Sequence, residues 1–265
     1  MEKLEMLQEI LRGCGSLVVA FSGGVDSSML TYAARQVLGD KAVAVTAVSE
    51  LLTKQELNDA KAIARVAGIR HEIIHVDDLA NENFVKNDKE RCYYCKKNRF
   101  DLLANWAKTN GFSKVADGSN LDDKGDYRPG MRALRENTYT ISPLMLAGYY
   151  KEDIRKQAKA WGLSVWDKPS AACLASRIRY GVAVTAERLH QVEIAEAVVR
   201  EYIPGQLRVR HHGDLARIEI EPAYFLDFLR VKEEIIAKLK TSGFTFITLD
   251  LQGYRMGSQN EVLKK

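Results

Sequence analysis

The sequence predicts an α/β protein in which an open parallel sheet is followed by a smaller α+β unit. Two observations support this fold class. Short apolar runs alternate with amphipathic helical segments through residues 16–77, a pattern that places helices on both faces of a parallel sheet. From about Leu189 onward the order changes to helix, hairpin, helix and strand, which is typical of a separate α+β unit.

In the first region, strands are expected where the apolar runs are short and bounded by polar or turn residues. Helices are expected between them, and Thr53 followed by Glu56 predicts a capping box at the start of one. The amino terminus is an acidic amphipathic helix without the features of a signal peptide. The expected strands are residues 16–22, 41–49, 71–77 and 113–119, and the expected helices are 1–13, 27–39, 53–68, 98–111 and 151–162.

In the second region, helices are predicted at 188–203 and 224–243, a hairpin at 206–222 and a strand at 244–251. The segment that precedes this region has weak periodicity and many small residues, which favours a functional loop. The predicted organisation is a domain over 1–168, a connecting active-site loop over 169–188, and a substrate or oligomerisation domain over 189–265.

Composition narrows the class of protein. Hydrophobic content of 46% and charged content of 28% are ordinary for a globular protein, and the longest apolar runs are too short to cross a membrane. The four cysteines and the lack of a signal peptide favour a reducing cytoplasm. A net charge of +4, with basic residues clustered at 176–180 and 208–212, favours one small polyanionic ligand over nucleic acid.

Residues 21–28, FSGGVDSS, follow a predicted strand and open a predicted helix. Backbone N–H groups at such a junction point toward a bound anion, glycines allow close approach, and serine hydroxyls add donors. Because the Gly-Lys-Ser/Thr end of a Walker loop is missing, this is a different phosphate loop. Asp26 is explained if Mg²⁺ bridges its carboxylate to a triphosphate. The predicted ATP-binding residues of this loop are Ser22, Gly23, Gly24, Asp26, Ser27 and Ser28.

This loop resembles the PP-loop of the N-type ATP pyrophosphatases, which share the adenine nucleotide alpha hydrolase-like fold. The resemblance implies that ATP adenylylates a substrate oxygen and pyrophosphate is released. GMP synthetase, NAD synthetase, tRNA lysidine synthetase and several tRNA thiolases look similar at this loop. The loop therefore predicts the activation step, whereas the substrate must be inferred from other segments.

Three further segments carry a more specific resemblance: 117–133, which contains Arg128; 168–177, which contains Cys173; and the hairpin that contains Arg208, Arg210 and Glu219. Together with the phosphate loop they resemble the LarE family, ATP-dependent sulfur transferases in the synthesis of the nickel-pincer cofactor of lactate racemase. The resemblance implies that carboxylates of pyridinium-3,5-dicarboxylate mononucleotide are adenylylated and converted to thiocarboxylates, with release of AMP and pyrophosphate. It also implies a homo-oligomer, such as a hexamer built from dimers.

Residue roles follow from the same resemblance. Cys173, Asp26, Ser176 and Arg177 are the expected catalytic residues, and Arg128 is expected to contact ATP. Ser176 and Arg177, together with Arg208 and Arg210, are expected to bind the substrate phosphate. The two last arginines alternate on one face of a predicted strand, so the alternative is an exposed edge-strand face. Glu219 could orient an arginine, bind a metal, or simply pair across the hairpin.

The cysteines raise the question of where the sulfur comes from. In single-cysteine LarE proteins the residue matching Cys173 gives up its own sulfur and becomes dehydroalanine. This sequence also has Cys92 and Cys95, and three thiolates can hold a [4Fe-4S] cluster whose fourth iron accepts sulfide or another sulfur donor. The alternatives are a zinc site completed by Cys14 or a histidine, sacrificial transfer from Cys173, and a redox pair.

Other functions are possible for the same fold. A tRNA thiolase would need a wide basic surface or an added RNA-binding domain, and residues 189–265 offer only one compact basic cluster. An amide-forming synthetase gives no reason for three cysteines, and an iron–sulfur scaffold would not need the phosphate loop. The sequence therefore favours a sulfur transferase acting on a nucleotide-like small molecule.

Overall fold

The computed structural model describes residues 2–124, 129–169 and 172–263. These residues form two compact units, and neither unit is simply one half of the chain. The first unit contains residues 1–78 and 92–171, and the second contains residues 79–91 and 172–265. Because compactness does not show independent folding, the ranges 1–168 and 189–265 remain predictions.

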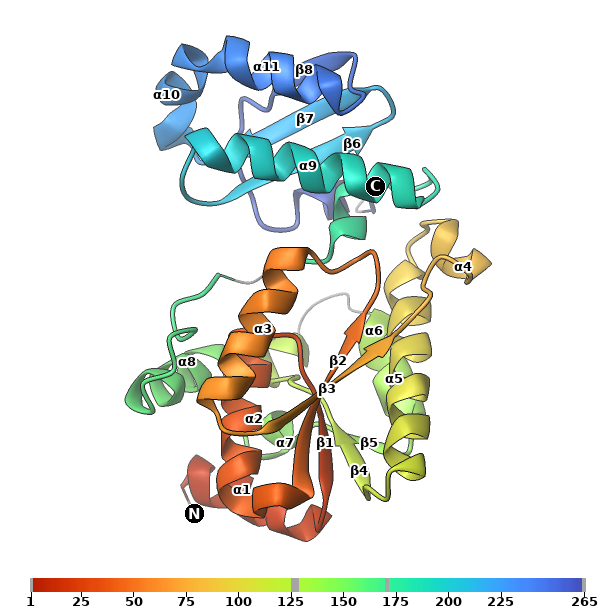
Figure 1. The fold of residues 1–265 in the computed structure, drawn as a ribbon, viewed down its shortest axis with the longest axis vertical. Helices are drawn as coiled ribbons and strands as arrows, with labels where there is room; N and C mark the ends of the chain where they lie inside the picture. The colour runs from red at the N-terminus through yellow and green to blue at the C-terminus, as the bar shows by residue number, and fades with distance from the viewer. Residues whose placement is uncertain (1, 125–128, 170–171, 264–265) are drawn as a thin grey trace. The chain divides into compact units, whose positions relative to one another are not determined.

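The first unit is built on a five-stranded sheet in which every neighbouring pair is parallel. The strand order is β3-β2-β1-β4-β5, which confirms the predicted α/β fold class (Figure 1). The edge strand β5 has only two residues, which is too short to have been expected from the sequence. The strands are β1 (Leu17–Ala20), β2 (Ala42–Val48), β3 (Arg70–His75), β4 (Lys114–Ala116) and β5 (Thr140–Ile141).

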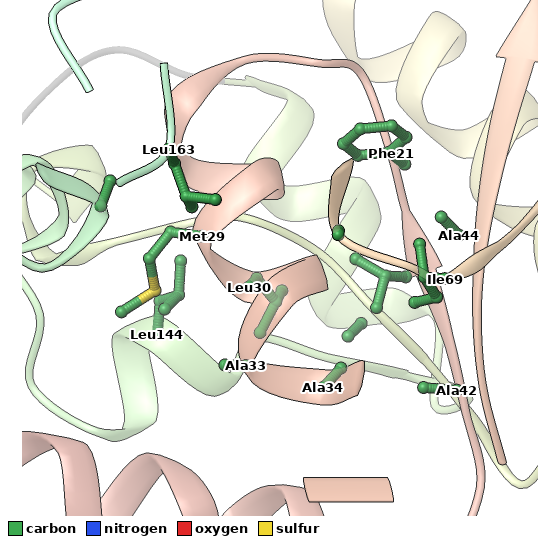
Figure 2. Packing of buried hydrophobic residues seen from close by; sticks show 14 of the residues in the cluster. Phe21, Met29, Leu30, Ala33, Ala34, Ala42, Ala44, Ile69, Leu144 and Leu163 are labelled. Atoms are coloured by element: carbon green, nitrogen blue, oxygen red, sulfur yellow. The ribbon is translucent and has the colours of Figure 1, made fainter. Parts of the chain in front are cut away.

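Helices cover both faces of this sheet because its strands are apolar on both sides. Leu17 and Val19 of β1 pack with helices α1, α2, α3, α7 and α8, and Figure 2 shows part of this core around Met29 and Leu30. Val18, between them, faces α5 and α6. The helices are α1 (Lys3–Cys14), α2 (Val25–Leu38), α3 (Lys54–Val66), α5 (Arg91–Thr109), α6 (Pro129–Glu136), α7 (Pro143–Leu146) and α8 (Lys151–Ala160).

Local signals explain where some helices begin. The predicted capping box of α3 is confirmed, because Thr53 Oγ1 accepts from Glu56 N at 3.1 Å and Thr53 N donates to the Glu56 carboxylate at 2.8 Å. Helix α5 begins at Arg91 rather than near residue 98, since no glycine or proline interrupts residues 91–109. Cys92 and Cys95 therefore lie at the start of this helix rather than before it.

The second unit packs helices against a three-stranded mixed sheet, as the α+β prediction required. Strands β6 (Leu207–His212) and β7 (Leu215–Ile220) form the expected antiparallel hairpin, and β8 (Phe246–Leu249) joins β7 in parallel. The helices are α4 (Glu82–Val85), α9 (Ala186–Tyr202), α10 (Phe225–Arg230) and α11 (Lys232–Thr241). The last two were expected as one helix. They separate at Val231, whose N–H bonds to Phe228 O in a tighter 3₁₀ turn.

In the described parts of both units, none of the helices combines the length and the apolar character that a bilayer span requires.

Candidate active site

The phosphate loop joins β1 to α2 and is held by its own hydroxyl groups. Ser27 Oγ donates to Gly24 O at 3.1 Å and lies 3.2 Å from Ser22 Oγ. Gly23 has φ 70°, and a Cβ there would meet Ala60 of α3 at 3.1 Å, so glycine is required on two counts. Gly24 occupies the N-cap of the 14-residue helix α2 without a side-chain cap, which leaves the first N–H groups of α2 for an anion.

Asp26, in the first turn of α2, forms a half-buried ion pair with a lysine that was not predicted from the sequence. Its Oδ2 accepts from Nζ of Lys151, the first residue of α8. The Lys151 main-chain N–H donates to Asp122 at 2.7 Å, which fixes the start of α8 beside the loop. Lys151 thus places a cation next to the loop in which a triphosphate would sit.

The chain that follows β4 also lies against the phosphate loop. Gly118 follows β4, and a Cβ there would lie 3.2 Å from Ser27 N and 3.3 Å from Asp26 Cβ, so this backbone packs directly against the phosphate loop. Asp117, before it, is almost fully buried and accepts from the Ser119 hydroxyl. The predicted nucleotide-contacting segment 117–133 therefore begins at the phosphate loop. Arg128, within that segment, lies outside the described residues.

Several polar atoms around the loop are buried without a hydrogen-bond partner among the described residues: Asp26 Oδ1, Asp117 Oδ1 and Ser28 Oγ. Buried polar atoms are normally satisfied, so unsatisfied ones indicate a place for a ligand or ion. Two of these atoms are carboxylate oxygens, the donors that Mg²⁺ prefers. The residues present therefore fit a magnesium ion held at Asp26.

Cys92 and Cys95 are three residues apart in the first turn of α5, so they lie on one side of that helix. Cys92 is exposed and Cys95 half-buried, whereas Cys14 ends α1, packs against the core and donates to Ile10 O at 3.3 Å. Burial raises the pKa of the Cys14 thiol, which makes it a poor ligand. No group of three or more His, Cys, Asp or Glu side chains that could hold a metal occurs within the described residues.

Cys173 belongs to the second unit and is exposed immediately before a 3₁₀ turn, Leu174–Arg177. Its carbonyl accepts from Ser176 N at 2.9 Å and from Arg177 Nη1 at 3.0 Å. Arg177 also donates to the Ser176 hydroxyl at 3.2 Å. The backbone around Cys173 is thus held by Arg177, while the thiol itself faces solvent.

A buried arginine–glutamate network surrounds this turn in the second unit. Arg177 makes a two-point ion pair with Glu196 of α9, at 2.8 and 3.0 Å. Arg210 of β6 donates to Glu219 of β7 at 2.8 Å and to Ser176 O at 3.1 Å. The predicted residues Ser176, Arg177, Arg210 and Glu219 are therefore brought together, and Arg208 lies on the same face of β6.

Glu219 is fully buried, and both of its carboxylate oxygens are occupied. They accept from Arg210, from Arg217 at 2.8 Å, and from the Ser258 hydroxyl at 2.9 Å. Burial by itself would raise the pKa of Glu219, but the hydrogen bond and charge of Arg210, with help from Ser258 and Arg217, lower it below its ordinary value. These contacts favour the role of orienting arginines, and the metal role of Glu219 stays a prediction.

Arg208 differs from its neighbours. It is only 7% exposed, so β6 does not present the exposed edge face that was the alternative. Its Nη1 donates to Leu207 O at 2.6 Å, its guanidinium lies 5.3 Å from the centre of the Tyr254 ring, and within the described chain it forms no ion pair. Burial, followed by the charge of Arg177, lowers the pKa of Arg208. Of the three buried arginines Arg177, Arg208 and Arg210, Arg208 is thus the one without a carboxylate partner among the described residues.

Comparisons with known proteins agree with this geometry. Residues 2–138 match the family model of the PP-loop domain. The chain is 36% identical, over 99% of its length, to the pyridinium-3,5-bisthiocarboxylic acid mononucleotide synthase of Lactiplantibacillus plantarum, covering 95% of that protein. The chain belongs to the LarE family of PP-loop enzymes. As a member of that family it is an ATP-dependent sulfur transferase.

Two other relatives differ in how much of this LarE chain they match. An uncharacterized protein of Synechocystis is 41% identical over 99% of the chain and 98% of its own length. The tRNA-specific 2-thiouridylase MnmA of Rickettsia prowazekii is 28% identical over 59% of the chain and 53% of that enzyme. The similarity to LarE therefore spans both compact units, whereas the similarity to MnmA is partial.

Sequence reasoning missed one residue beside the phosphate loop of this LarE chain and one residue of its arginine network. Lys151 lies 125 residues from Asp26, and nothing in the local pattern around it indicates the contact. The sequence pattern around Glu196 could have indicated that its side chain is buried. It falls on the stripe of α9 that also carries Leu189, Val192 and Val199, and an acid at a core position of an amphipathic helix indicates a buried partner.

Proposed function

We propose that this protein adenylylates carboxylates of pyridinium-3,5-dicarboxylate mononucleotide and converts them to thiocarboxylates for nickel-pincer cofactor synthesis. The observation that carries the proposal is the similarity to the L. plantarum synthase over 99% of the chain, which includes both the phosphate loop and the arginine network. In the first step a substrate carboxylate oxygen attacks the α-phosphorus of ATP, and pyrophosphate leaves. In the second step sulfur attacks the acyl carbon, and AMP leaves.

The first unit supplies the ATP site of this proposal. The N–H groups at the start of α2 and the hydroxyls of Ser22, Ser27 and Ser28 bind phosphate oxygens. Asp26 would hold Mg²⁺, which would supply positive charge to the triphosphate. Lys151, whose ammonium group lies beside the phosphate loop, is placed to donate to a phosphate oxygen of the leaving group.

The second unit supplies the mononucleotide phosphate site. Arg208 forms no ion pair with the described residues, unlike Arg177 and Arg210, so its charge is available to bind a phosphate. Ser176, Arg177 and Arg210 surround the same position, with the two arginines oriented by Glu196 and Glu219. A buried, pre-oriented guanidinium binds phosphate well because little side-chain freedom is lost.

For the sulfur step, we propose that Cys92, Cys95 and Cys173 hold a [4Fe-4S] cluster. The support is the thiol pair on one side of α5, the exposure of Cys173, and the packing of Cys14 into the core. Such a cluster would present its fourth iron to sulfide or another small sulfur donor. The alternatives remain a sacrificial Cys173 without a cluster and a tRNA thiolase of the same fold, which the partial MnmA similarity favours. Cytoplasmic location and assembly into a homo-oligomer, such as a hexamer, are also part of this proposal.

The deciding experiment uses anaerobically purified protein with ATP, Mg²⁺, sulfide and pyridinium-3,5-dicarboxylate mononucleotide. A cluster predicts bound iron, several thiocarboxylates per chain, and an unchanged mass at Cys173. A sacrificial mechanism predicts at most one sulfur per chain and dehydroalanine at Cys173. Activity in Cys92→Ala and Cys95→Ala at the wild-type level would remove the cluster. Thiolation of tRNA, with no reaction of the mononucleotide, would replace the proposed substrate.

A further inference from the structure

Arg99 joins α5 to the ends of two strands of the first unit. Its Nη1 donates to Ala47 O of β2 at 3.0 Å, and its Nη2 donates to the Ser49 hydroxyl at 2.6 Å and to Asp78 Oδ2 at 2.7 Å. Ser49 directly follows β2, and Asp78 lies three residues after β3. The Ser49 hydroxyl also donates to Asp78 Oδ2 at 2.7 Å. One guanidinium therefore attaches a helix to the carboxyl ends of two neighbouring strands.

This attachment is buried rather than superficial. The Asp78 side chain is 1% exposed, and that of Arg99 is 20% exposed. A carboxylate is costly to bury unless a charged partner and hydrogen bonds compensate it, and Asp78 has both. An exposed ion pair would hold a helix only weakly. The Arg99–Asp78 pair thus indicates that the position of α5 against the strand ends matters.

The attachment lies at the level of the phosphate loop. Strands β1 and β2 are parallel, and Ala20 of β1 pairs with Val45 of β2. Two residues farther along each strand, Ala47 is level with Ser22, which belongs to the loop. Ligands of parallel α/β sheets bind outside the carboxyl ends of the strands. Arg99 therefore contacts β2 at the edge of the sheet where the phosphate loop lies.

The start of α5 extends beyond this edge. A helix that connects two parallel strands runs back along the sheet, so α5, between β3 and β4, begins at the carboxyl edge. Cys95 and Cys92 precede Arg99 by four and seven residues, which puts all three side chains on one face of the helix. At a rise of about 1.5 Å per residue, the Cα atom of Cys95 lies about 6 Å from that of Arg99 along the helix axis.

A second contact holds the same part of α5. Gly130 of α6 is buried, and a Cβ there would lie 2.9 Å from Lys96 Cγ and 3.4 Å from Cys92 O. Helix α6 therefore packs closely against the start of α5, and a larger residue at 130 would press on it. The thiol pair is thus mounted on a helix start that is held both by Arg99 and by Gly130.

We propose that Arg99 is a positioning residue that holds Cys92 and Cys95 at the nucleotide edge of the first unit. The inference rests on the proposed sulfur-transfer function for what the two thiols do, but their position is a property of the metal-free chain. A nucleotide bound at the phosphate loop would then lie beside the start of α5. Its presence should reduce the reactivity of the thiols, and this effect should depend on Arg99.

The test measures thiol reactivity without any metal. In a Cys14→Ser/Cys173→Ser background, Cys92 and Cys95 are the remaining cysteines. The metal-free protein is alkylated with iodoacetamide, without and with Mg²⁺ and saturating α,β-methylene-ATP, an analogue that is not cleaved at the α-phosphorus. Mass spectrometry of peptides gives the rate at each thiol. We expect the analogue to slow alkylation of Cys95 several-fold.

Arg99→Lys is the decisive variant. Lysine keeps a positive charge opposite Asp78, but it lacks the planar fork that contacts Ala47, Ser49 and Asp78 together. Without the analogue, alkylation of Cys95 should rise by about tenfold, because one net hydrogen bond is worth on the order of one decade in an equilibrium. Most of the protection by the analogue should be lost, whereas its affinity, measured by titration, should stay nearly unchanged.

Two further measurements separate positioning from a general loss of stability. Lys97→Ala removes an exposed ion pair with Asp101 on the same helix and should leave both alkylation rates unchanged. Hydrogen exchange in Arg99→Lys should become faster at residues 92–98 and stay unchanged at residues 102–109 of α5. Gly130→Ala leaves the contacts of Arg99 in place but presses on Lys96, so it should also change the reactivity of the thiols.

The outcomes are distinct. Equal alkylation of both thiols with and without the saturating analogue overturns the proposal, as does protection in Arg99→Lys that equals that of the background protein. If Arg99→Lys does not fold, Ser49→Ala, which removes one acceptor and keeps the ion pair, gives the same decision. Protection that depends on Arg99, in a four-cysteine protein that binds no iron on anaerobic reconstitution, supports the positioning role and removes the cluster.

Discussion

The phosphate loop of the first unit and the arginine network of the second unit both suit negatively charged ligands, but the loop relies on backbone groups and small side chains, whereas the network relies on charged side chains. The loop uses backbone N–H groups, glycine and serine, and its Asp26 Oδ1 is buried without a hydrogen-bond partner among the described residues. The network uses buried arginines that are already paired with Glu196 and Glu219, with Arg208 as the exception. The loop is therefore incomplete without a ligand, whereas the network is largely satisfied before one arrives.

The two sites should respond differently to the loss of a carboxylate. Glu219→Ala should lower the free energy of unfolding by about 3–5 kcal/mol, because Arg210 would be left buried without its partner. Urea unfolding measures this change. Asp227→Ala, which breaks an exposed ion pair with Arg230 in the same unit, is the matched control and should cost at most about 1 kcal/mol. Equal losses in the two variants would show that the network adds nothing through burial.

Asp26→Ala should have the opposite profile. Asp26 lies at the edge of the loop and carries an oxygen without a partner in the described residues, so its removal leaves the fold intact. Pyrophosphate release should fall by about a hundredfold or more, the effect of removing one group that stabilises developing charge. Glu152→Ala, at an exposed position next to Lys151, serves as control. Pyrophosphate release at the wild-type rate in Asp26→Ala would remove the magnesium assignment.

Replacing Arg208 tests the role of the one buried arginine of the network that has no carboxylate partner among the described residues. Arg208→Ala should weaken mononucleotide binding by about 1.5–3 kcal/mol, the range for hydrogen bonds to charged groups, and it should leave ATP affinity unchanged. Isothermal titration with each ligand separates the two effects. Arg217→Ala is a suitable comparison, since Arg217 is more exposed and already paired with Glu219. A drop in ATP affinity would instead assign Arg208 to the triphosphate.

The smallest expected effect is a pH dependence of stability. Burial, the largest cause in each case, lowers the pKa of His71 in the first unit and of His211 and His212 in the second. The unfolded chain therefore binds more protons than the folded chain below about pH 6.5, and stability falls as pH falls through that range. His211 donates from Nε2 to Gln191 at 3.0 Å and accepts from Gly213 N at 3.2 Å, which fixes its neutral form. His211→Gln should flatten urea midpoints measured between pH 7.5 and 5.5, and an unchanged slope would contradict this assignment.

The sequence was sufficient for features whose parts are adjacent in the chain. The phosphate loop could be predicted because two glycines, three serines and an aspartate lie within eight residues directly after a strand. The hairpin and the capping box at Thr53 were predictable for the same reason. Lys151, Glu196 and the association of residues 79–91 with the second unit depend on contacts across many residues, which local patterns do not encode. The early start of α5 was missed because the helix was expected only after the cysteine pair, over residues 98–111.

The discontinuity of the second unit has a consequence for the order in which the chain folds. Residues 79–91 are synthesised before residues 92–171 of the first unit, yet the acceptors of the Asn87 amide lie 91–95 residues later. During synthesis, the Asn87 amide therefore cannot form these bonds until the chain near Val182 has left the ribosome, and forming them closes a long loop. A fragment ending at residue 168 would keep this segment without its acceptors. Because each unit consists of two separate stretches of the chain, a single cut of the gene cannot separate the coding regions of the two units.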